Sequence, residues 1–248
     1  MLETNFVAGC VVENKHWTEH LYSLRVDAGS VPFTAGQFGK LALDIDGERV
    51  ARPYSFVNAP HEPISEFYSS IVPAGPLSPR LATLKPGDEI WLANKGSGFL
   101  VLDEVPQGKY LWLLSTGTAL GPFLSILKTA EPWQRFERIV LVHAVRYVKD
   151  LSYHDTIKQF EKEHADCFAA ISFVSREEID FAVRGRVPAA IDDGVLEQRG
   201  DMPFNTDSQV MICGNPDMVK DSTAALEKKG LKKNRRRTPG HITVERYW

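Results

Sequence analysis

Apolar and polar residues alternate in short segments along the first hundred residues of the chain. Residues 22–26 and 41–45 place an apolar side chain at every second position, which is the period of a half-buried antiparallel strand. The Asp-Gly pair at 46–47 is a hairpin signal that follows the second segment. Further strands are predicted at 67–72 and 89–93. Short strands at this spacing predict a small barrel or sandwich.

The pattern changes after residue 102, where continuous apolar runs alternate with helical segments. Strands are predicted at 110–114, 139–145, 168–174 and 209–213, and the first of them is expected to be buried on both faces. Helices are predicted at 123–130, 151–163 and 217–229. Alternating strands and helices imply a parallel sheet with helices on both faces. The chain is therefore predicted to have two domains: an antiparallel β-barrel over residues 1–101 and an α/β domain with a parallel sheet over residues 102–248.

Composition and charge exclude several classes of protein. A net charge of −3 over 248 residues gives no overall attraction to nucleic acid. Cys10, Cys167 and Cys213 are too few and too far apart for a disulfide framework, a zinc site or an iron–sulfur cluster. The N-terminus lacks a signal-peptide pattern, and the apolar runs are too short to cross a bilayer. We therefore expect a soluble protein of the reducing cytoplasm, without a metal.

One cluster of candidate ligand-binding residues ends a strand of the first domain. Arg52, Pro53, Tyr54 and Ser55 combine a cation, an aromatic ring and a hydroxyl within four positions. Such a set suits a flavin nucleotide, with the cation on the pyrophosphate and the ring against the isoalloxazine. The same residues would also suit an ordinary strand with an exposed arginine and a core tyrosine.

Two loops have the features of nucleotide-binding turns. Residues 75–81 form a predicted loop into a short helix, with Ser78 as its N-cap and Pro79 at its first position, and a helix N-terminus suits phosphate. An ordinary capped helix is the alternative. Residues 115–122 follow the first buried strand of the α/β domain, and their small side chains let a nucleotide approach the backbone. Ala119 makes this turn depart from the GxGxxG fingerprint.

Arginines follow the strands of the second domain. The segment at 139–145 leads into Arg146, the segment at 168–175 leads into Arg176, and Arg186 follows nearby. An acidic residue at such a position would take the 2′-hydroxyl of NAD, whereas arginines accommodate the 2′-phosphate of NADP. Glu177 and Glu178 could instead pair with Arg176 on the surface. The pattern favours NADP over NAD.

Two further segments complete the candidate chemistry. Cys213 ends the last predicted strand and precedes Gly-Asn-Pro, so it lies at the carboxyl edge of the sheet, where a nicotinamide would bind. A buried structural cysteine is the commoner reading of such a residue. The last two residues of the sequence are Tyr247 and Trp248, and two large rings at a chain end suit stacking on planar groups.

The motifs RxYS, GxLSxxL, TGTxxGP and CGNPxM, followed by a terminal acidic–x–Tyr–Trp, occur in this order along the chain. The chain thereby resembles the bacterial ferredoxin/flavodoxin–NADP reductases over essentially its whole length, and in particular the enterobacterial-type subclass that ends in Tyr-Trp. The resemblance implies an FAD-binding antiparallel barrel followed by an NADP-binding α/β domain. It also implies an FAD-dependent oxidoreductase that exchanges a hydride with NADPH and single electrons with ferredoxin or flavodoxin.

The resemblance further implies roles for individual residues. The residues expected to hold FAD are Arg52, Pro53, Tyr54, Ser55, Tyr68, Pro76, Leu77, Ser78, Thr118, Tyr247 and Trp248. The residues expected to hold NADP are Val145, Arg146, Ser175, Arg176, Arg186, Asn215, Pro216 and Met218. The catalytic residues around the hydride-transfer site would be Ser55, Cys213 and Glu245. Tyr247 would cover the flavin ring and Trp248 the adenine.

A basic run from Lys228 to Arg237 is the remaining candidate for binding a partner. We expect it to receive an acidic ferredoxin or flavodoxin; a solvated helix face and a nucleic-acid contact are the alternatives. A monomer that binds neither nucleic acid nor membrane is predicted. Two rival functions stay open: a flavin-dependent NAD(P)H reductase that serves an oxygenase or reduces free flavin, and a non-enzymatic nucleic-acid-binding protein.

Overall fold

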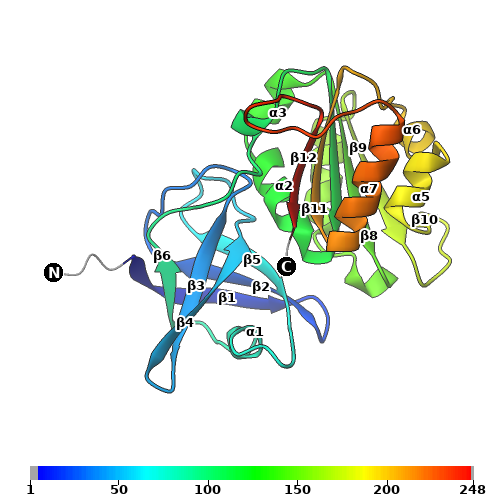
Figure 1. The fold of residues 1–248 in the computed structure, drawn as a ribbon. Helices are drawn as coiled ribbons and strands as arrows, with labels where there is room; N and C mark the ends of the chain where they lie inside the picture. The colour runs from blue at the N-terminus through cyan, green and yellow to red at the C-terminus, as the bar shows by residue number, and fades with distance from the viewer. Residues whose placement is uncertain (1–4, 247–248) are drawn as a thin grey trace.

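The computed structural model describes residues 5–246 and contains two sheets, one above the other (Figure 1). The first sheet is antiparallel, has six strands and curls on itself in the order β4-β3-β6-β1-β2-β5. Its strands are β1 (Phe6–His16), β2 (Leu21–Asp27), β3 (Phe38–Ile45), β4 (Glu48–Ser55), β5 (Ser65–Ser70) and β6 (Glu89–Ala93). A bridge between Phe56 and Phe67 brings the two edges together, and the predicted barrel is thereby confirmed.

The alternation seen in the sequence matches the burial along these strands. Leu24 and Val26 on β2 and Leu41 on β3 point into the barrel core and are fully buried. The β3–β4 hairpin turns at Asp46 and Gly47, which both have positive φ angles of 52° and 85°. A two-residue hairpin needs this left-handed backbone, and the Asp-Gly pair supplies it.

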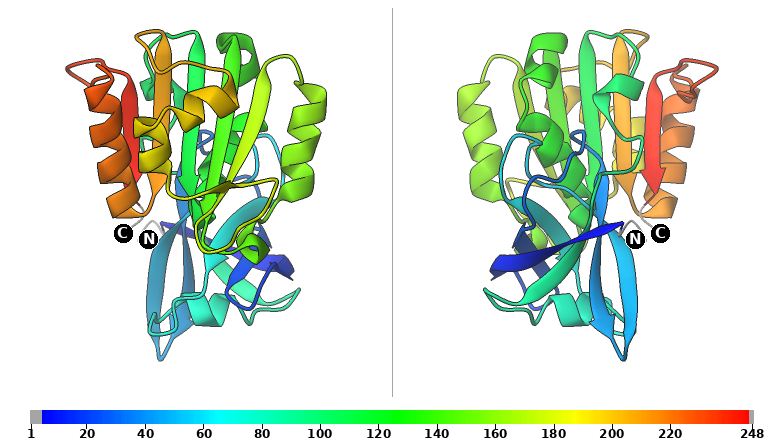
Figure 2. Two further views of the ribbon diagram at one scale, coloured as in Figure 1. Left: turned by 90° about the vertical axis from the view of Figure 1, so that its right-hand side faces the viewer. Right: turned by 90° about the vertical axis from the view of Figure 1, so that its left-hand side faces the viewer.

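The second sheet is parallel, as predicted, with the strand order β10-β9-β8-β7-β11-β12. Its strands are β7 (Tyr110–Thr116), β8 (Arg138–Val145), β9 (Phe168–Val174), β10 (Val183–Arg184), β11 (Ser208–Gly214) and β12 (Ile242–Arg246). Helices cover both faces (Figure 2): α2 (Leu120–Leu127), α3 (Glu131–Arg135), α4 (His154–Glu163), α5 (Val187–Asp192), α6 (Val195–Gly200) and α7 (Pro216–Lys228). The sequence pattern did not indicate β10, β12, α3, α5 or α6.

Helix α4 begins three residues later than the predicted segment at 151–163. Residues Val148–Asp150 form a 3-10 turn, and Tyr153, directly before the helix, has a left-handed φ of 59°. A bulky aromatic residue seldom adopts this conformation, and a pattern of apolar positions does not reveal it.

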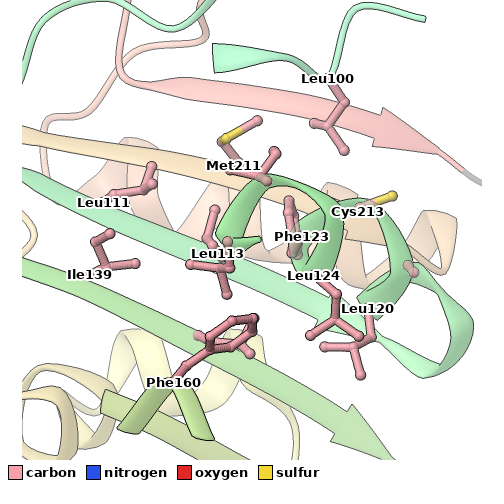
Figure 3. Close-up of a cluster of buried hydrophobic side chains, with 14 of the residues drawn as sticks. Leu100, Leu111, Leu113, Leu120, Phe123, Leu124, Ile139, Phe160, Met211 and Cys213 are labelled. Atoms are coloured by element: carbon pink, nitrogen blue, oxygen red, sulfur yellow. The ribbon is translucent and has the colours of Figure 1, made fainter. Parts of the chain in front are cut away.

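The barrel lies against the carboxyl edge of the parallel sheet (Figures 1 and 2). Leu21, Val57 and Tyr68 of the barrel belong to the same buried cluster as Leu120 and Phe123 of α2. Figure 3 shows the part of this cluster on one face of the parallel sheet. The segment between β6 and β7 carries a short 3-10 turn, η1 (Leu102–Glu104), and the predicted domain boundary at 101/102 falls within that connection. The boundary itself stays a prediction.

His143 is a buried polar residue on β8, within the parallel sheet. Its ring is hydrogen-bonded to the backbone of Gly117, while its Nε2 atom has no hydrogen-bond partner among residues 5–246. Burial lowers the pKa of His143 to about 4, and the Gly117 hydrogen bond opposes this only in part. The imidazole is therefore neutral at physiological pH, as the apolar surroundings require.

We expect the protein to lose stability as the pH falls from about 6.5 toward about 4, because the unfolded chain binds a proton on His143 that the folded chain excludes. Between pH 7 and pH 5 this residue alone should lower the free energy of unfolding by about 2 kcal/mol. Urea unfolding of wild type and His143→Asn at both pH values measures the effect. Equal pH dependence in the two proteins would contradict the assignment.

Candidate functional site

A cleft of about 560 Å³ opens where the barrel meets the parallel sheet. Its lining residues are Phe38, Arg52, Pro53, Tyr54, Ser55, Tyr68, Ser69, Ser70, Val72, Gly75, Pro76, Leu77, Ser78, Thr118 and Glu245. Every residue up to Thr118 in the predicted FAD set therefore lines one cleft, contributed by segments far apart in sequence. Tyr247 and Trp248 lie outside the described residues. The volume is typical of a small-molecule site.

The end of β4 supplies the first group of side chains. Arg52 is exposed, donates from Nη1 to the Ala51 carbonyl at 2.7 Å, and forms no ion pair within the described part of the chain. Burial raises the pKa of Tyr54 to about 12, against the opposing effect of Arg52, so its hydroxyl stays protonated. Ser55 is buried at the end of the strand. A guanidinium without a carboxylate partner at the rim of the cleft is available to an anion.

The predicted N-cap role of Ser78 is wrong. Leu77 is the N-cap residue, and Ser78 is the first residue of α1 (Ser78–Leu81). The Ser78 hydroxyl instead accepts a hydrogen bond from the Val72 backbone N–H at 2.9 Å, so it holds the loop after β5 closed. Four residues are too short a helix for the expected N-terminal phosphate site. Ser78 still lines the cleft.

A side chain of β1 supports α1 from outside the cleft. The Asn14 amide donates from Nδ2 to the carbonyls of Leu81, Ala82 and Leu84, at 3.1, 3.1 and 2.9 Å. Because α1 ends at Leu81, these carbonyls have no partner in a further helical turn, although the Leu81 carbonyl also accepts from the Leu84 N–H at 3.3 Å. The amide of Asn14 thus holds the segment that carries Leu77 and Ser78.

Two turns at the carboxyl edge of the parallel sheet are locked together. The Asn215 backbone N–H donates to Thr116 Oγ1 at 2.9 Å. Gly214 has a φ of +135°, and a Cβ there would lie 2.1 Å from the same oxygen, so only glycine is accommodated. The Asn215 side chain caps α7 by accepting from the N–H groups of Asp217 and Met218. The CGNPxM segment is therefore a rigid turn.

The three predicted catalytic residues differ in exposure. Glu245 and Ser55 line the cleft, and burial raises the pKa of Glu245 to about 7. Cys213 pairs in register with Glu245 but is fully buried, with its side chain among apolar residues (Figure 3). Burial, and then the charge of Glu245, raise the pKa of the Cys213 thiol well above its ordinary value. A neutral buried thiol does not act as a nucleophile.

The predicted arginines gather at one edge of the sheet. Arg146 and Arg176 follow β8 and β9, and the Arg176 N–H donates to the Arg146 carbonyl at 2.9 Å. Val145 and Ser175 lie beside them and are linked by a hydrogen bond of 3.1 Å. Arg186 precedes α5.

The nearby carboxylates have other partners than Arg176. Glu177 accepts from the Val148 N–H at 2.5 Å, and Glu178 pairs with Arg184 at 3.0 Å. Within residues 5–246, none of the exposed side chains of Arg146, Arg176 and Arg186 forms an ion pair. These guanidinium groups are thus free of competing carboxylates.

Some lining residues were absent from the predicted set, namely Phe38, Ser69, Ser70, Val72 and Gly75. Phe38 pairs with Ser55 across the β3–β4 hairpin, so counting the register from the Asp-Gly turn would have found it. Ser69 and Ser70 continue the strand that carries Tyr68.

No group of histidine, cysteine and acidic residues in the described chain could hold a metal, and none of its helices is long and apolar enough to span a membrane.

Comparisons with known proteins agree with this geometry. The family model described as oxidoreductase NAD-binding domain matches residues 113–224. The flavodoxin/ferredoxin–NADP reductase of Escherichia coli (strain K12) is 50% identical over 98% of this chain and 99% of its own length. The ferredoxin–NADP reductase of Pseudomonas aeruginosa is 37% identical, with 98% of each chain covered.

Solved structures show the same similarity. A ferredoxin NADP+ reductase from Neisseria gonorrhoeae, crystallised with bound FAD and NADP, superposes with a TM-score of 0.94 at 31% identity, covering 99% of this chain and 100% of that one. The FAD/NAD-binding domain of a nitric oxide dioxygenase from Vibrio cholerae has a TM-score of 0.82 at 18% identity, covering 98% and 99%, which shows the fold alone. Because identities of 37% and 50% extend over nearly the full length of the chain, they show the family as well as the fold. This chain belongs to the family of bacterial flavodoxin/ferredoxin–NADP reductases.

Proposed function

We propose that this protein transfers electrons between NADPH and a small carrier protein, ferredoxin or flavodoxin, through a bound FAD. The single observation that carries the proposal is the cleft at the junction of the two domains, where aromatic rings, hydroxyls, an unpaired arginine and Glu245 meet. The E. coli relative carries both carriers in its name, and the N. gonorrhoeae relative was crystallised with FAD and NADP. We further propose that the protein is a monomer of the cytoplasm, a compartment that suits three dispersed cysteines.

The residues of the cleft fit a flavin nucleotide. The rings of Tyr54 and Tyr68 line the cleft and suit contact with a planar ring, and Ser55 and Thr118 are polar residues of the same lining. Arg52 lies at the rim and suits the pyrophosphate. When bound, FAD exchanges a hydride with nicotinamide and single electrons with a carrier, which no side chain of the protein can do.

Glu245 is the acid–base group best placed for the reaction. It lines the cleft and has a pKa near 7, so it can gain or release a proton at physiological pH. Cys213 lies behind it on the neighbouring strand and contributes an apolar wall instead of a reactive thiolate. Asn215, Pro216 and Met218, at the start of α7, are proposed to contact the nicotinamide end of NADP.

The function is tested by supplying the purified protein with FAD and recording its visible spectrum, then adding NADPH or NADH with a carrier. We expect bound flavin that denaturation releases as free FAD, and carrier reduction with NADPH. A protein that stays colourless would contradict the proposal and favour the nucleic-acid-binding alternative. Equal rates with NADH, without carrier reduction, would favour a reductase that serves an oxygenase.

The coenzyme preference depends on the exposed arginines. We expect Arg176→Ala and Arg186→Ala each to remove a charge-assisted contact with the 2′-phosphate, of roughly 1.5–3 kcal/mol. The KM for NADPH should therefore rise about tenfold to hundredfold, with little change for NADH. Arg184→Ala is the matched control, because Arg184 lies on the same segment but pairs with Glu178. An equal loss with both coenzymes would show that these arginines do not contact the 2′-phosphate.

The basic run from Lys228 to Arg237 divides into two parts. Lys228, Lys229 and Lys233 form ion pairs with Asp192, Glu197 and Glu227. The turn at residues 235–237 is exposed: Arg236 pairs with Glu104 at 3.0 Å, whereas Arg235 and Arg237 form no ion pair with any described residue. The proposed carrier-docking segment is therefore the turn at 235–237 instead of the whole run.

An exposed aromatic ring connects this turn to the cleft. The Arg236 guanidinium lies 4.2 Å from the ring centroid of Phe99, which is 62% exposed. Gly98, the preceding residue, is close enough to the cleft that a Cβ there would lie 3.5 Å from Glu245 Oε2. A cationic turn beside an exposed aromatic ring suits an acidic partner that must approach the flavin.

Reversing charge with Arg235→Glu and Arg237→Glu should slow carrier reduction roughly tenfold at low salt and flatten its salt dependence, because electrostatic steering is lost. Reduction of a small dye should persist. Lys158→Glu with Lys162→Glu on α4 makes the same change in net charge, and α4 packs against β9, far from the β12 edge of the sheet. If both pairs of changes slow the carrier equally, only net charge matters and the turn is not a docking site.

A further inference from the structure

A chain of hydrogen bonds, buried at its centre and partly buried at its ends, crosses the junction between the barrel and the parallel-sheet domain. Trp17 Nε1 donates to Ser23 Oγ at 2.6 Å, and Ser23 Oγ lies 2.5 Å from the hydroxyl of Tyr153. The Tyr153 hydroxyl donates to Glu66 Oε1 at 2.7 Å. Three of these residues belong to the barrel domain, whereas Tyr153 belongs to the parallel-sheet domain.

Only one arrangement of protons satisfies this chain. The indole N–H of Trp17 can only donate, and the ionised carboxylate of Glu66 can only accept. Tyr153 must therefore donate to Glu66, and Ser23 must donate to the Tyr153 oxygen. Burial, and then the charge of Glu66, raise the pKa of Tyr153 well above its ordinary value, so the hydroxyl keeps its proton. Each hydrogen bond depends on the others.

The backbone of Tyr153 is held in an unfavourable conformation. Its φ of 59° is left-handed, which is costly for an aromatic residue, and its side chain is only 5% exposed. The ring contacts Trp17 at 4.7 Å and Tyr68 at 5.2 Å between centroids. Strain of this kind persists only where the surroundings hold the residue in place.

Tyr153 ends the loop that begins with Arg146. Residues 146–153 lead from the carboxyl end of β8 to α4. At the end of this loop, Ser152 Oγ accepts a hydrogen bond of 2.8 Å from the hydroxyl of Tyr68, which lines the cleft. Ser152 and Tyr153, the last two residues of the loop, are therefore both hydrogen-bonded to the barrel, and the partner of Ser152 is the cleft-lining Tyr68.

We propose that Tyr153 is a positioning residue, which clamps the loop at 146–153 to the barrel and so fixes the distance between the coenzyme-binding arginines and the flavin cleft. This inference rests on the proposed function, since the distance matters only if a nicotinamide must reach a flavin. Hydride transfer is sensitive to small displacements between donor and acceptor. An aromatic hydroxyl that bridges two domains is suited to hold that distance.

The first test compares amide hydrogen exchange in FAD-supplied wild type, Tyr153→Phe and Ser125→Ala. Ser125 Oγ also donates across the junction, to the Asn58 carbonyl at 2.7 Å, but lies on α2 away from the loop. We expect Tyr153→Phe alone to increase exchange at Asp150 and Leu151, whose N–H groups are bonded within the loop. Unchanged exchange there, or an equal increase in Ser125→Ala, would overturn the clamp.

The second test follows flavin reduction by NADPH in rapid mixing. Tyr153→Phe should slow it roughly tenfold or more, by lowering kcat more than it raises the KM for NADPH. Oxidation of the chemically reduced flavin by a one-electron dye should stay at the wild-type rate. Glu66→Gln, which keeps an acceptor for Tyr153, should behave nearly as wild type. A Tyr153→Phe protein that is reduced as fast as Ser125→Ala would overturn the positioning role.

The two tests separate this inference from the proposed function. If NADPH does not reduce the flavin of the wild-type protein, the proposed function fails, and the positioning role fails with it. If the wild type is reduced and Tyr153→Phe matches it, the positioning role alone fails. The exchange measurement does not depend on catalysis, so it decides whether the clamp exists in either case.

Discussion

The burial of apolar side chains between the barrel and helix α2 is the interaction on which the rest of the structure depends. Leu21, Val57 and Tyr68 share one core cluster with residues of α2 and the parallel sheet, so the two domains do not have separate cores at this point. Gly121 has little space, since a Cβ there would lie 3.3 Å from Val57. This contact turns the carboxyl edge of the sheet, where nucleotides bind in such folds, toward the barrel.

Burial at this junction also sets the protonation of the groups around the cleft. Removal from water raises the pKa of Glu245 to about 7 and that of Cys213 well above its ordinary value, while within the parallel sheet it lowers the pKa of His143. The buried hydroxyls of Tyr68 and Tyr153 stay protonated for the same reason, and each has a hydrogen-bond partner. A junction that excludes water thus supplies neutral donors and one acid that titrates near neutral pH.

The charged residues at the surface are of two kinds, lysines that are paired with carboxylates and arginines that are not. Lys228, Lys229 and Lys233, at and after the end of α7, are paired with carboxylates, and pairs of this kind at a surface contribute little to stability. The arginines that follow β8 and β9 form no ion pair with described residues, and neither does Arg52 at the cleft rim. These guanidinium groups have no carboxylate partner among the described residues, so an anionic ligand explains their presence better than folding does.

The sequence by itself determined the order of the barrel and the α/β domain and most of their strands, because period and turn chemistry are local properties. Most residues of the cleft were predicted through the resemblance of the motifs to a known family, and Phe38 was missed. The Asp-Gly turn set the β3–β4 hairpin, and continuous apolar runs predicted the buried parallel strands. Only the tertiary structure decided that Ser78 bonds Val72, that Cys213 is buried, and that Tyr153 is left-handed and bonded to the barrel. Each of these depends on a partner supplied by another segment of the folded chain, and no local pattern of residues specifies such a partner.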